Sequence, residues 1–316
     1  MLDKTKQSLK NIAFKNNIVA GLSQTPKTIS SEWFYDSIGS SLFDVITLLP
    51  EYYPTRTETS IFLSNIFDIT KKMGSEVELV EYGSGSSEKT RLLFDNHHGI
   101  LRYIPVEISE SYLTSSIERL RQDYPELSFL PKQGSFLDDY VFPPTLHNAR
   151  RVGFFPGSTI GNLRDYQIDQ FFKITRDNLG DGAALIIGID LKKAGEIIVP
   201  AYNDKLGVTA AFNLNVLNRI NRELGSNFDL SHFRHEAIWN ETQSRIEMLL
   251  ISQYEHIINI DSHAFHFNKG ESVLTEISRK FPIGHLDNLA QNHGWKTTHS
   301  WQDKNKWFQI ILFEAN

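Results

Sequence analysis

A short segment rich in glycine and serine is the first candidate for chemistry in this chain. The sequence EYGSGSSEKT at residues 81–90 continues directly from the apolar run VELV. Glycine has no side chain beyond Cα, so it lets the backbone turn sharply and approach a ligand closely. A loop of this kind after a strand can bind a nucleotide, a dinucleotide or S-adenosylmethionine, and its other residues distinguish these ligands.

Glu88 decides among the three ligands. A phosphate-binding P-loop has glycine directly before its Lys-Thr pair, whereas Lys89-Thr90 follow Glu88 here. Gly83 and Gly85 fit a dinucleotide fingerprint, but Glu88 again takes the third glycine position, where a pyrophosphate would meet the helix N-terminus. S-adenosylmethionine has no phosphate, so the carboxylate does not oppose it. The loop therefore favours this methyl donor, and a Gly-Ser turn without a ligand is the alternative.

Further polar residues follow two later apolar runs. The Glu107 carboxylate at the end of YIPVE can accept hydrogen bonds from both ribose hydroxyls, although NAD enzymes use an acid in a similar place. Thr159 and Asn162 lie in the segment FPGSTIGN at 155–162. Ligands of open α/β sheets bind at the carboxyl ends of the strands, so these side chains are expected near the Gly83 loop. Asn162 then either binds a carboxylate or amine, or caps the next helix.

Two histidine pairs, His232 with His235 and His263 with His266, have spacings that occur in metal sites. Neither pair belongs to an H-E-x-x-H helix. The second pair lies in a strand-like stretch, where residues three apart point to opposite faces. The chain has no cysteine, which removes thiolate ligands and disulfides. Histidines on the surface or in the domain outside the sheet are therefore expected, and no metal.

The elements that must position the polar residues alternate between apolar runs and amphipathic segments. The apolar runs occupy residues 77–83, 103–109, 127–133, 151–157 and 184–190. Continuous apolar strands separated by helices predict an α/β fold with a doubly wound parallel sheet.

The remaining segments follow other patterns. The expected elements are helices and turns over 1–75, a helix over 207–225, antiparallel strands over 233–268, helix over ESVLTEISRKF at 271–281 and beyond it, and a hairpin formed by 294–303 and 307–315. The organisation predicts a sheet domain at 61–195 completed by 287–316, and a second domain formed by 1–60 and 196–286.

Composition narrows the function classes. The 316 residues are 40% hydrophobic and 22% charged, as in a globular protein with a sizeable core, and the net charge is −6. This charge gives no general reason to bind nucleic acid or anionic lipid. No apolar run approaches the roughly 20 residues that span a bilayer, and the polar N-terminus does not resemble a signal peptide. We expect a cytoplasmic monomer, in keeping with the absence of cysteine.

Seven collinear segments resemble the histidine Nα-methyltransferases of ergothioneine biosynthesis, from about residue 30 to the C-terminus. They are FYDSIGSSLFDVITLLPEYYPTR, EYGSGSSEKTR, FFPGSTIGN, DLKK, AYNDKLGVTAAFNLNVLNRINRELG, RIEM and GESVLTEISRKF. The resemblance implies a class I methyltransferase (Rossmann-like) sheet with a second α+β substrate-binding domain. It also implies trimethylation of the α-amine of L-histidine to hercynine, with S-adenosylmethionine as the donor and without a metal.

The resemblance also implies roles for individual residues. The positions that would contact the methyl donor are Gly83, Lys89, Glu107, Ser135 and Phe136, to which the 155–162 segment adds Gly157 and Thr159. The substrate residues would be Asn162 and Tyr202 at the carboxylate, Tyr52, Glu276 and Ser278 at the imidazole, Met248 packed against the ring, and Tyr35 near the reacting amine.

Two donor positions depart from the family. The family usually has Asp where Glu107 stands and often has an acid at Ser135. Glu107 keeps the ribose-binding chemistry with one more methylene group. Ser135 removes a carboxylate partner for the adenine amino group, unless Asp138 or Asp139 replaces it. The departures bear on donor affinity and not on donor identity.

The chemistry requires an unprotonated amine aligned with an activated methyl group, and such positioning contributes about 7–11 kcal/mol in favourable systems. Tyr35 can orient the amine without being an obligatory base, and the faces of Tyr35 or Phe43 can accommodate a quaternary ammonium. Glu276 is expected to select histidine, because a site built around a buried polar partner rejects analogues that lack it.

Two alternatives remain. One is a methyltransferase of the same fold that acts on another amino acid such as tryptophan, against which Met248 and Glu276 argue. The other is a non-catalytic binding module that retains the fold.

Overall fold

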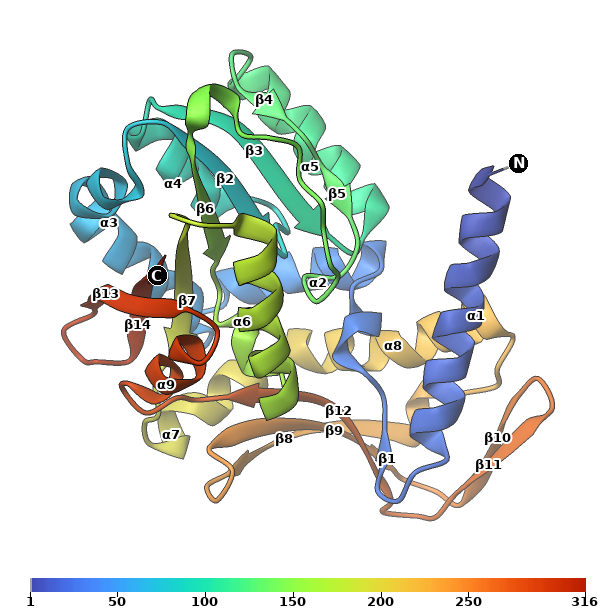
Figure 1. Cartoon of the computed structure of the whole chain (residues 1–316). Helices are drawn as coiled ribbons and strands as arrows, with labels where there is room; N and C mark the ends of the chain where they lie inside the picture. Colours follow the sequence, from blue (N-terminus) through green and yellow to red (C-terminus); the bar gives the residue numbers. More distant parts are fainter. Residues whose placement is uncertain (1) are drawn as a thin grey trace. The chain divides into compact units, whose positions relative to one another are not determined.

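The computed structural model describes residues 2–316, with side chains from residue 11 onward (Figure 1). The chain forms two compact units. The first unit consists of Met1–Tyr52 and Ala194–Ser278, and the second unit consists of Tyr53–Lys193 and Arg279–Asn316. The boundaries expected from the sequence lay at 60/61, 195/196 and 286/287, whereas the first boundary of the structure coincides with the start of helix α3 (Tyr53–Met73).

The second unit is built on a mixed β-sheet. Its strands, in spatial order, are β13 (Trp295–Gln302), β14 (Phe308–Ala315), β7 (Ala184–Asp190), β6 (Arg150–Phe155), β2 (Val77–Tyr82), β3 (Ile100–Glu107) and β4 (Ser128–Phe129), and β5 (Lys132–Gln133) also pairs with β3. Strands β2 to β7 pair in parallel, whereas β14 runs antiparallel to β7 and β13. The predicted doubly wound parallel sheet and the terminal hairpin are confirmed, with the run at 127–133 divided between β4 and β5.

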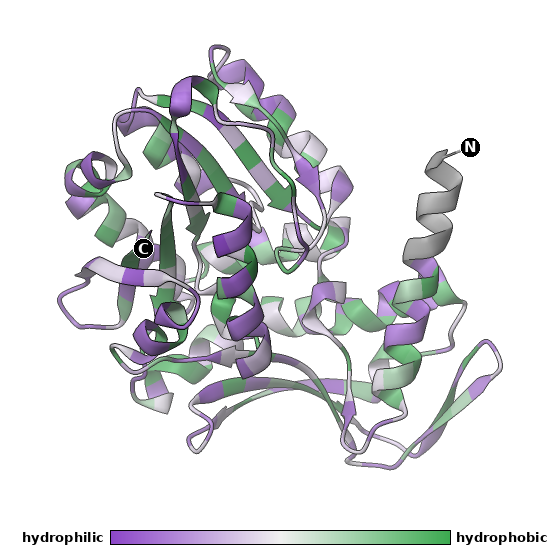
Figure 2. Cartoon of the chain, in the orientation of Figure 1, coloured by the Kyte–Doolittle hydropathy of each residue, from purple (hydrophilic) through white to green (hydrophobic). Residues whose placement is uncertain are grey.

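Helices cover both faces of this sheet. The side chains of α3, α4 (Glu88–Asn96) and α5 (Glu110–Asp123) form one apolar core with the strands, and those of α6 (Asp165–Leu179) and α9 (His285–Gln291) form another. Because both faces are covered, β2 and β7 are buried along their whole length, which explains the apolar sequence of β7 and the apolar residues of β2 on either side of the buried Glu78 and Glu81. Figure 2 shows the apolar residues of β7 in the middle of the sheet.

The first unit combines helices with smaller sheets. Its four-stranded sheet has the order β1 (Lys27–Thr28), β12 (Ser272–Arg279), β9 (Arg245–Ser252) and β8 (Phe233–Asn240), while β10 (His256–Ile260) pairs with β11 (His263–Phe267). Its helices are α1 (Leu2–Leu22), α2 (Ser37–Leu48), α7 (Gly195–Ile198) and α8 (Val208–Leu224), with 3-10 turns η1 (Ser31–Phe34), η4 (Val199–Tyr202) and η5 (Leu230–His232). The predicted helix at 207–225 and the antiparallel strands within 233–268 are confirmed.

The prediction of a helix over 271–281 is wrong for most of that segment. Residues Ser272–Arg279 form strand β12, and only the later α9 is helical. Val273, Thr275 and Ile277 place β-branched side chains at every second position, which suits a strand. The pairing partners, β1 and β9, lie elsewhere in the chain, so tertiary pairing decides the structure of this segment.

Across residues 2–316, none of the helices is both long enough and apolar enough to cross a membrane.

Candidate functional site

The loop after β2 has a backbone that favours glycine. Gly83 and Gly85 have φ values of +72° and +50°, in the left-handed region that other residues adopt at a cost. The amides of Gly83 and Ser84 both donate to the carbonyl of Val106, at 2.8 and 3.2 Å, so β3 fixes the start of the loop. A Cβ added at Gly85 would have no heavy atom within 4 Å. The loop is therefore fixed on one side and open on the other.

Glu107, at the end of β3, holds the same loop through its side chain. One carboxylate oxygen accepts a hydrogen bond from the Gly85 amide at 3.1 Å, and the other accepts from the Ser109 amide at 3.0 Å. Burial raises the pKa of Glu107, and the hydrogen bonds from the backbone oppose that rise. A carboxylate has about four acceptor sites, so Glu107 retains capacity for hydroxyl donors.

Lys89 is tied to a residue that the sequence analysis missed. The Lys89 ammonium forms an ion pair with Glu58 on α3, whose side chain is completely buried. Both oxygens of Glu58 also accept from the Gly157 amide, at 3.0 and 2.9 Å. A Cβ at Gly188 on β7 would lie 1.9 Å from Oε1 of Glu58, so this packing requires glycine there. Glu58 thus joins α3, α4, β7 and the loop after β6.

A signal for Glu58 is present in the sequence. It shares the buried face of α3 with Pro54, Ile61 and Phe62, at helical spacing. A carboxylate on an otherwise apolar stripe needs a buried partner, and this requirement identifies such a position as a candidate.

Ser135 and Phe136 lie in the loop after β5. The Ser135 amide donates to the Asp138 carboxylate at 2.8 Å, and the Ser135 hydroxyl accepts from the Leu137 amide at 3.1 Å. Asp138 therefore supplies a carboxylate beside the position where the family often has an acid. The Phe136 ring lies 5.1 Å from that of Phe155 and would be 3.9 Å from a Cβ at Gly83, which brings this loop to the glycine loop.

The segment after β6 forms the 3-10 turn η3 (Thr159–Asn162). The Thr159 hydroxyl donates to the carbonyl of Pro156 at 2.9 Å. Arg164, and not Asn162, is the N-cap residue of α6, and its backbone amide donates to the side-chain oxygen of Gln167 at 3.0 Å. The alternative in which Asn162 caps this helix is therefore excluded.

These residues of the second unit fit S-adenosylmethionine. The Ser84 hydroxyl oxygen is buried and has no hydrogen-bond partner among the residues that the structure describes. It sits between two left-handed glycines, one of which faces open space. A ligand with hydroxyl and amino groups would supply partners for both Ser84 and the remaining acceptor sites of Glu107.

A second group of predicted residues meets in the first unit. The hydroxyls of Tyr202 and Ser278 are hydrogen-bonded at 2.8 Å, and the ring of Tyr52 lies 6.2 Å from that of Tyr202. Glu276 is two positions before Ser278 on β12 and is only 8% exposed, while Met248 is buried on neighbouring β9. The structure therefore gathers Tyr52, Tyr202 and Ser278, and places Glu276 and Met248 on the adjoining strands.

Tyr35 connects to this group through aromatic rings. Its ring lies 5.9 Å from Phe43, which in turn lies 6.1 Å from Tyr52. The amide of Asp36 donates to the carbonyl of Phe34 at 3.1 Å, and Tyr35 between them has φ −89° and ψ 57°, the conformation of an inverse γ-turn. The turn sets the direction in which the Tyr35 side chain leaves the backbone.

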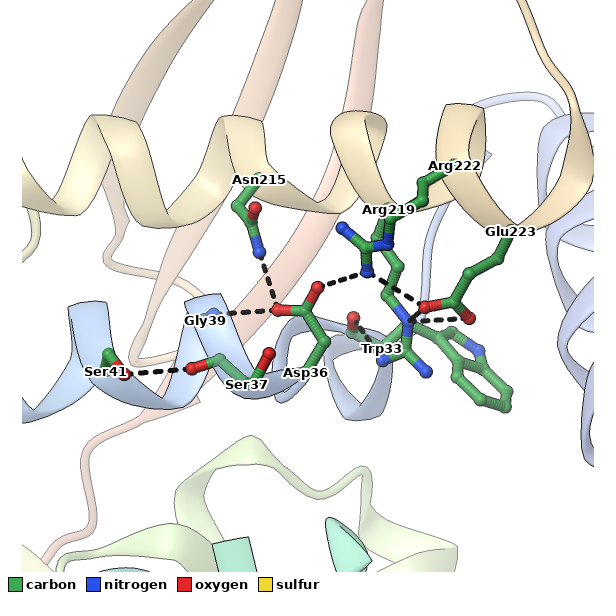
Figure 3. Close-up of polar contacts among 9 residues, drawn as sticks. All are labelled: Trp33, Asp36, Ser37, Gly39, Ser41, Asn215, Arg219, Arg222 and Glu223. Atoms are coloured by element: carbon green, nitrogen blue, oxygen red, sulfur yellow. Dashed lines mark hydrogen bonds and ion pairs between the residues drawn. The ribbon is translucent and has the colours of Figure 1, made fainter. Parts of the chain in front are cut away.

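Helix α8 holds the turn that carries Tyr35 (Figure 3). The Asp36 carboxylate caps α2 by accepting from the Gly39 amide at 2.7 Å, and it also accepts from Asn215 at 2.9 Å and Arg222 at 2.6 Å. Arg219, on the same side of α8, donates to the carbonyl of Trp33 at 2.9 Å. Because three side chains from α8 bind residues 33–36, the position of Tyr35 depends on that helix.

The predicted residues are divided between the units. The second unit contains Gly83, Lys89, Glu107, Ser135, Phe136, Gly157, Thr159 and Asn162, and the first unit contains Tyr35, Tyr52, Tyr202, Met248, Glu276 and Ser278.

The His232 and His235 side chains are half-buried in the first unit, whereas His263 and His266 are exposed on the β10–β11 hairpin. The described residues contain no group of three or more His, Asp or Glu side chains arranged to hold a metal ion. The His232 ring packs against Tyr254 and His256, and the half-buried His235 ring bonds to Asn213 and to the carbonyl of Tyr202.

Comparisons with known proteins agree on one family. The family described as SAM-dependent histidine-specific methyltransferases matches residues 14–315. The histidine N-alpha-methyltransferase of Mycolicibacterium smegmatis is 41% identical over 298 residues, which cover 92% of this chain and 91% of that protein. The enzyme of the same name from Mycobacterium tuberculosis is 39% identical over 276 residues, covering 86% and 85%. Ergothioneine biosynthesis protein 1 of Neurospora crassa is 26% identical over 266 residues, covering 78% of this chain and 30% of that protein.

Proposed function

Because the chain belongs to the family of SAM-dependent histidine-specific methyltransferases, we propose that it converts L-histidine to hercynine by three methylations of the α-amine, the first step of ergothioneine biosynthesis. The observation that carries the proposal is the family match over residues 14–315, which includes both groups of residues described above. S-adenosylmethionine is the methyl donor, and its sulfonium supplies a methyl group that is already activated for in-line displacement.

In the proposal, the second unit binds the donor. Glu107 accepts from the ribose hydroxyls, and the Gly83 loop, with Phe136 and Ser135 beside it, surrounds the rest of the molecule. The other edge of the donor site is formed by Lys89, Gly157 and Thr159. Glu58 holds this edge in place through its ion pair with Lys89 and its two contacts with the Gly157 amide. Asp138 takes the part of the acid that the family often has at Ser135.

The first unit, together with Asn162, is proposed to bind histidine. Asn162 and Tyr202 hold the substrate carboxylate, and Tyr52, Glu276 and Ser278 bind the imidazole against Met248. A carboxylate at Glu276 accepts a ring N–H and so selects one tautomer of the imidazole. The hydrogen bond between Tyr202 and Ser278 supports the proposal, because it links the residue for the carboxylate to one for the ring.

Tyr35 is proposed to orient the amine. The amine must lose its proton before its lone pair can attack, and a neighbouring positive charge favours the neutral form. The Tyr35 hydroxyl can accept a hydrogen bond from the amine, directly or through water, and thereby align the lone pair. After each transfer the nitrogen must release a proton before the next, and after the third it is a quaternary ammonium, which the faces of Tyr35 and Phe43 can accommodate.

The first experiment incubates the protein with S-adenosylmethionine and each of the twenty amino acids and measures product masses. We expect histidine alone to gain methyl groups, up to three. A methylated product from tryptophan or tyrosine in place of histidine would keep the donor but reject the proposed pocket. A purified protein that binds the donor and methylates none of the amino acids would reject the enzymatic proposal in favour of a binding module.

We further propose that the protein acts as a monomer in the cytoplasm, and the absence of cysteine suits that reducing compartment. Light scattering over a range of protein concentrations tests the monomer, since a mass that rises with concentration would reject it.

A further inference from the structure

A chain of hydrogen bonds inside the first unit passes behind the predicted histidine-binding residues. It runs from the backbone carbonyl of Tyr202 to the ring of His235, then to the side chain of Asn213, and ends at the hydroxyl of Thr275. Asn213 and Thr275 are almost completely buried. This chain of hydrogen bonds therefore links η4, β8, α8 and β12 through side chains that water does not reach freely.

The partners fix the direction of each hydrogen bond. The Tyr202 carbonyl can only accept, so Nε2 of His235, 2.9 Å away, carries the hydrogen and donates it. Nδ1 then accepts from the Asn213 amide nitrogen at 2.9 Å, and this nitrogen also donates to the carbonyl of Leu249 at 3.2 Å. A second proton on Nδ1 would face an N–H donor. The arrangement thus requires the neutral ring.

The far end of the chain reaches the strands of the pocket. The amide oxygen of Asn213 accepts from the Thr275 hydroxyl at 2.7 Å, and this hydroxyl also lies 2.9 Å from the carbonyl of Met248. Thr275 is directly followed by Glu276 on β12, and Met248 lies on β9. The chain of hydrogen bonds consequently connects the backbone at Tyr202 with the backbone at Met248 and Glu276.

Charged groups and burial act on the ring in opposite directions. Burial is the largest influence and lowers the pKa of His235, whereas the hydrogen bond to Tyr202 and the charges of Asp204 and Glu236 raise it. Asp204 follows η4, and Glu236 is the residue after His235 on β8. The groups that α8 and β9 contribute next to the ring are neutral, namely the Asn213 side chain and the carbonyl of Leu249. The net direction is downward, which keeps the ring neutral at physiological pH.

We propose that His235 is a positioning residue for the substrate pocket. As the neutral tautomer with its hydrogen on Nε2, His235 holds Tyr202 in place relative to Met248, Glu276 and Ser278. The inference rests on the proposed function of that pocket. It predicts that histidine affinity, but not donor affinity, depends on the protonation state of His235.

The sign of the pH effect follows from the direction of the shift. Above the ordinary pKa of histidine, 6.5, the ring is neutral and the chain is intact. As pH falls below that value and through the lowered pKa of the folded protein, His235 gains a proton and the bond from Asn213 is lost. Binding of the substrate L-histidine should then weaken at low pH, by more than the protonation of the free substrate accounts for.

The test compares His235→Leu and His235→Gln in two calorimetric titrations of the purified protein. One measures binding of S-adenosylhomocysteine, and the other measures binding of L-histidine to the protein loaded with S-adenosylhomocysteine. Leucine keeps most of the bulk and removes both bonds, so we expect the Kd for histidine to rise roughly tenfold while the Kd for S-adenosylhomocysteine stays within about twofold. Glutamine can still donate to Tyr202 and should restore much of the affinity.

The pH dependence separates positioning from a general loss of structure. As the pH is lowered from about 8 through the pKa of His235, the wild-type protein should lose more histidine affinity than His235→Gln, which has no ring to protonate. His263→Gln, on the exposed hairpin β10–β11, is the matched control and should behave as the wild type does. Thr275→Val removes the last hydroxyl at nearly constant volume and should weaken histidine binding less than His235→Leu does.

Three outcomes would overturn the inference: an unchanged Kd for histidine in His235→Leu, an equal loss of both affinities, or the full acid weakening in His235→Gln. If the leucine variant does not fold, the glutamine and Thr275→Val titrations still decide. The proposed function has its own test, because methylation of histidine by the wild-type protein does not depend on these variants.

Discussion

The residues proposed to bind the donor and those proposed to bind histidine are held in different ways. In the second unit, backbone geometry forms the site: left-handed glycines, amides that bond to Glu107, and a loop fixed by β3. In the first unit, side chains from α2, η4, β9 and β12 form it, joined by neutral hydrogen bonds and aromatic rings. A site made of backbone leaves a local sequence pattern, whereas a site made of distant side chains leaves none.

The two groups also differ in buried charge. Beneath the donor loop, Glu58 and Lys89 form an ion pair, and Glu81 is buried with hydrogen bonds from Thr90 and Tyr103. In the proposed histidine pocket, the hydrogen bonds of Tyr202 to Ser278 and His235 join neutral groups, and the ion pair of Asp36 with Arg222 lies at the turn that carries Tyr35. The comparison predicts that substitutions of buried charge weaken the second unit most, and that substitutions in the pocket act on substrate selection.

The largest effect is expected for Glu58→Ala. The substitution leaves Lys89 in a largely buried position without its carboxylate, and it removes the acceptor of the Gly157 amide. Loss of one partner of a buried pair lowers the free energy of unfolding by about 4 kcal/mol. Urea unfolding measures this loss, and donor binding should weaken with it. Lys173→Ala, which breaks an exposed ion pair with Asp177 on α6, is the control and should change neither quantity. Equal stability of the two variants would contradict the importance of the buried pair.

Glu81→Gln should alter the pH dependence of stability. Burial raises the pKa of Glu81 to about 8, although the hydrogen bonds from Thr90 and Tyr103 oppose the rise. A raised pKa means that the contribution to stability is complete below the ordinary value of 4.5 and is lost as pH rises through about 8. The glutamine side chain of the variant keeps the shape of glutamate and does not titrate. Relative to the Glu81→Gln variant, the wild-type protein should therefore lose a few kcal/mol of stability as the pH rises from about 4.5 to about 8.

Urea unfolding at several pH values measures the difference, with Glu118→Gln on the exposed face of α5 as the control. Parallel stability curves for the wild-type protein and Glu81→Gln would show that Glu81 does not titrate in this window.

The same contrast explains what could be predicted from the sequence. The parallel strands, the terminal hairpin and α8 have local signals: continuous apolar runs, or apolar residues at helical spacing. Gly83 and Glu107 follow strands directly, so their neighbourhood at the sheet edge could be inferred.

Other features depend on partners far away in the chain. The strand β12 is decided by its pairing with β1 and β9, and its own sequence also permits a helix. The place of Glu58 on the apolar face of α3 marks it as a candidate, but its partners Lys89 and Gly157 lie 31 and 99 positions away. Tyr52, Met248 and Glu276 belong to three separate segments without a common local pattern, so only the family resemblance indicated them.

Glu276→Ala tests the selection of histidine. We expect the KM for histidine to rise roughly 30-fold, because a hydrogen bond to a charged group is lost, while the KM for the donor stays within about twofold. Glu107→Ala is the reciprocal variant and should raise the KM for the donor and leave that for histidine nearly unchanged. Steady-state kinetics with each substrate varied in turn measures both constants. Comparable losses of both affinities in Glu276→Ala would remove this residue from the histidine pocket.

The smallest effect is expected for Asp36→Ala. The substitution removes the N-cap of α2 and the partners of Asn215 and Arg222, which lowers the free energy of unfolding by about 1 kcal/mol. Because Asp36 directly follows Tyr35, the tyrosine should lose its fixed direction, and kcat should fall more than the KM for either substrate changes. Asp229→Ala removes the cap of η5 in the same unit and should leave kcat unchanged. If both variants lower kcat to the same extent, the cap acts through general stability, and the hold of α8 on Tyr35 has no part in catalysis.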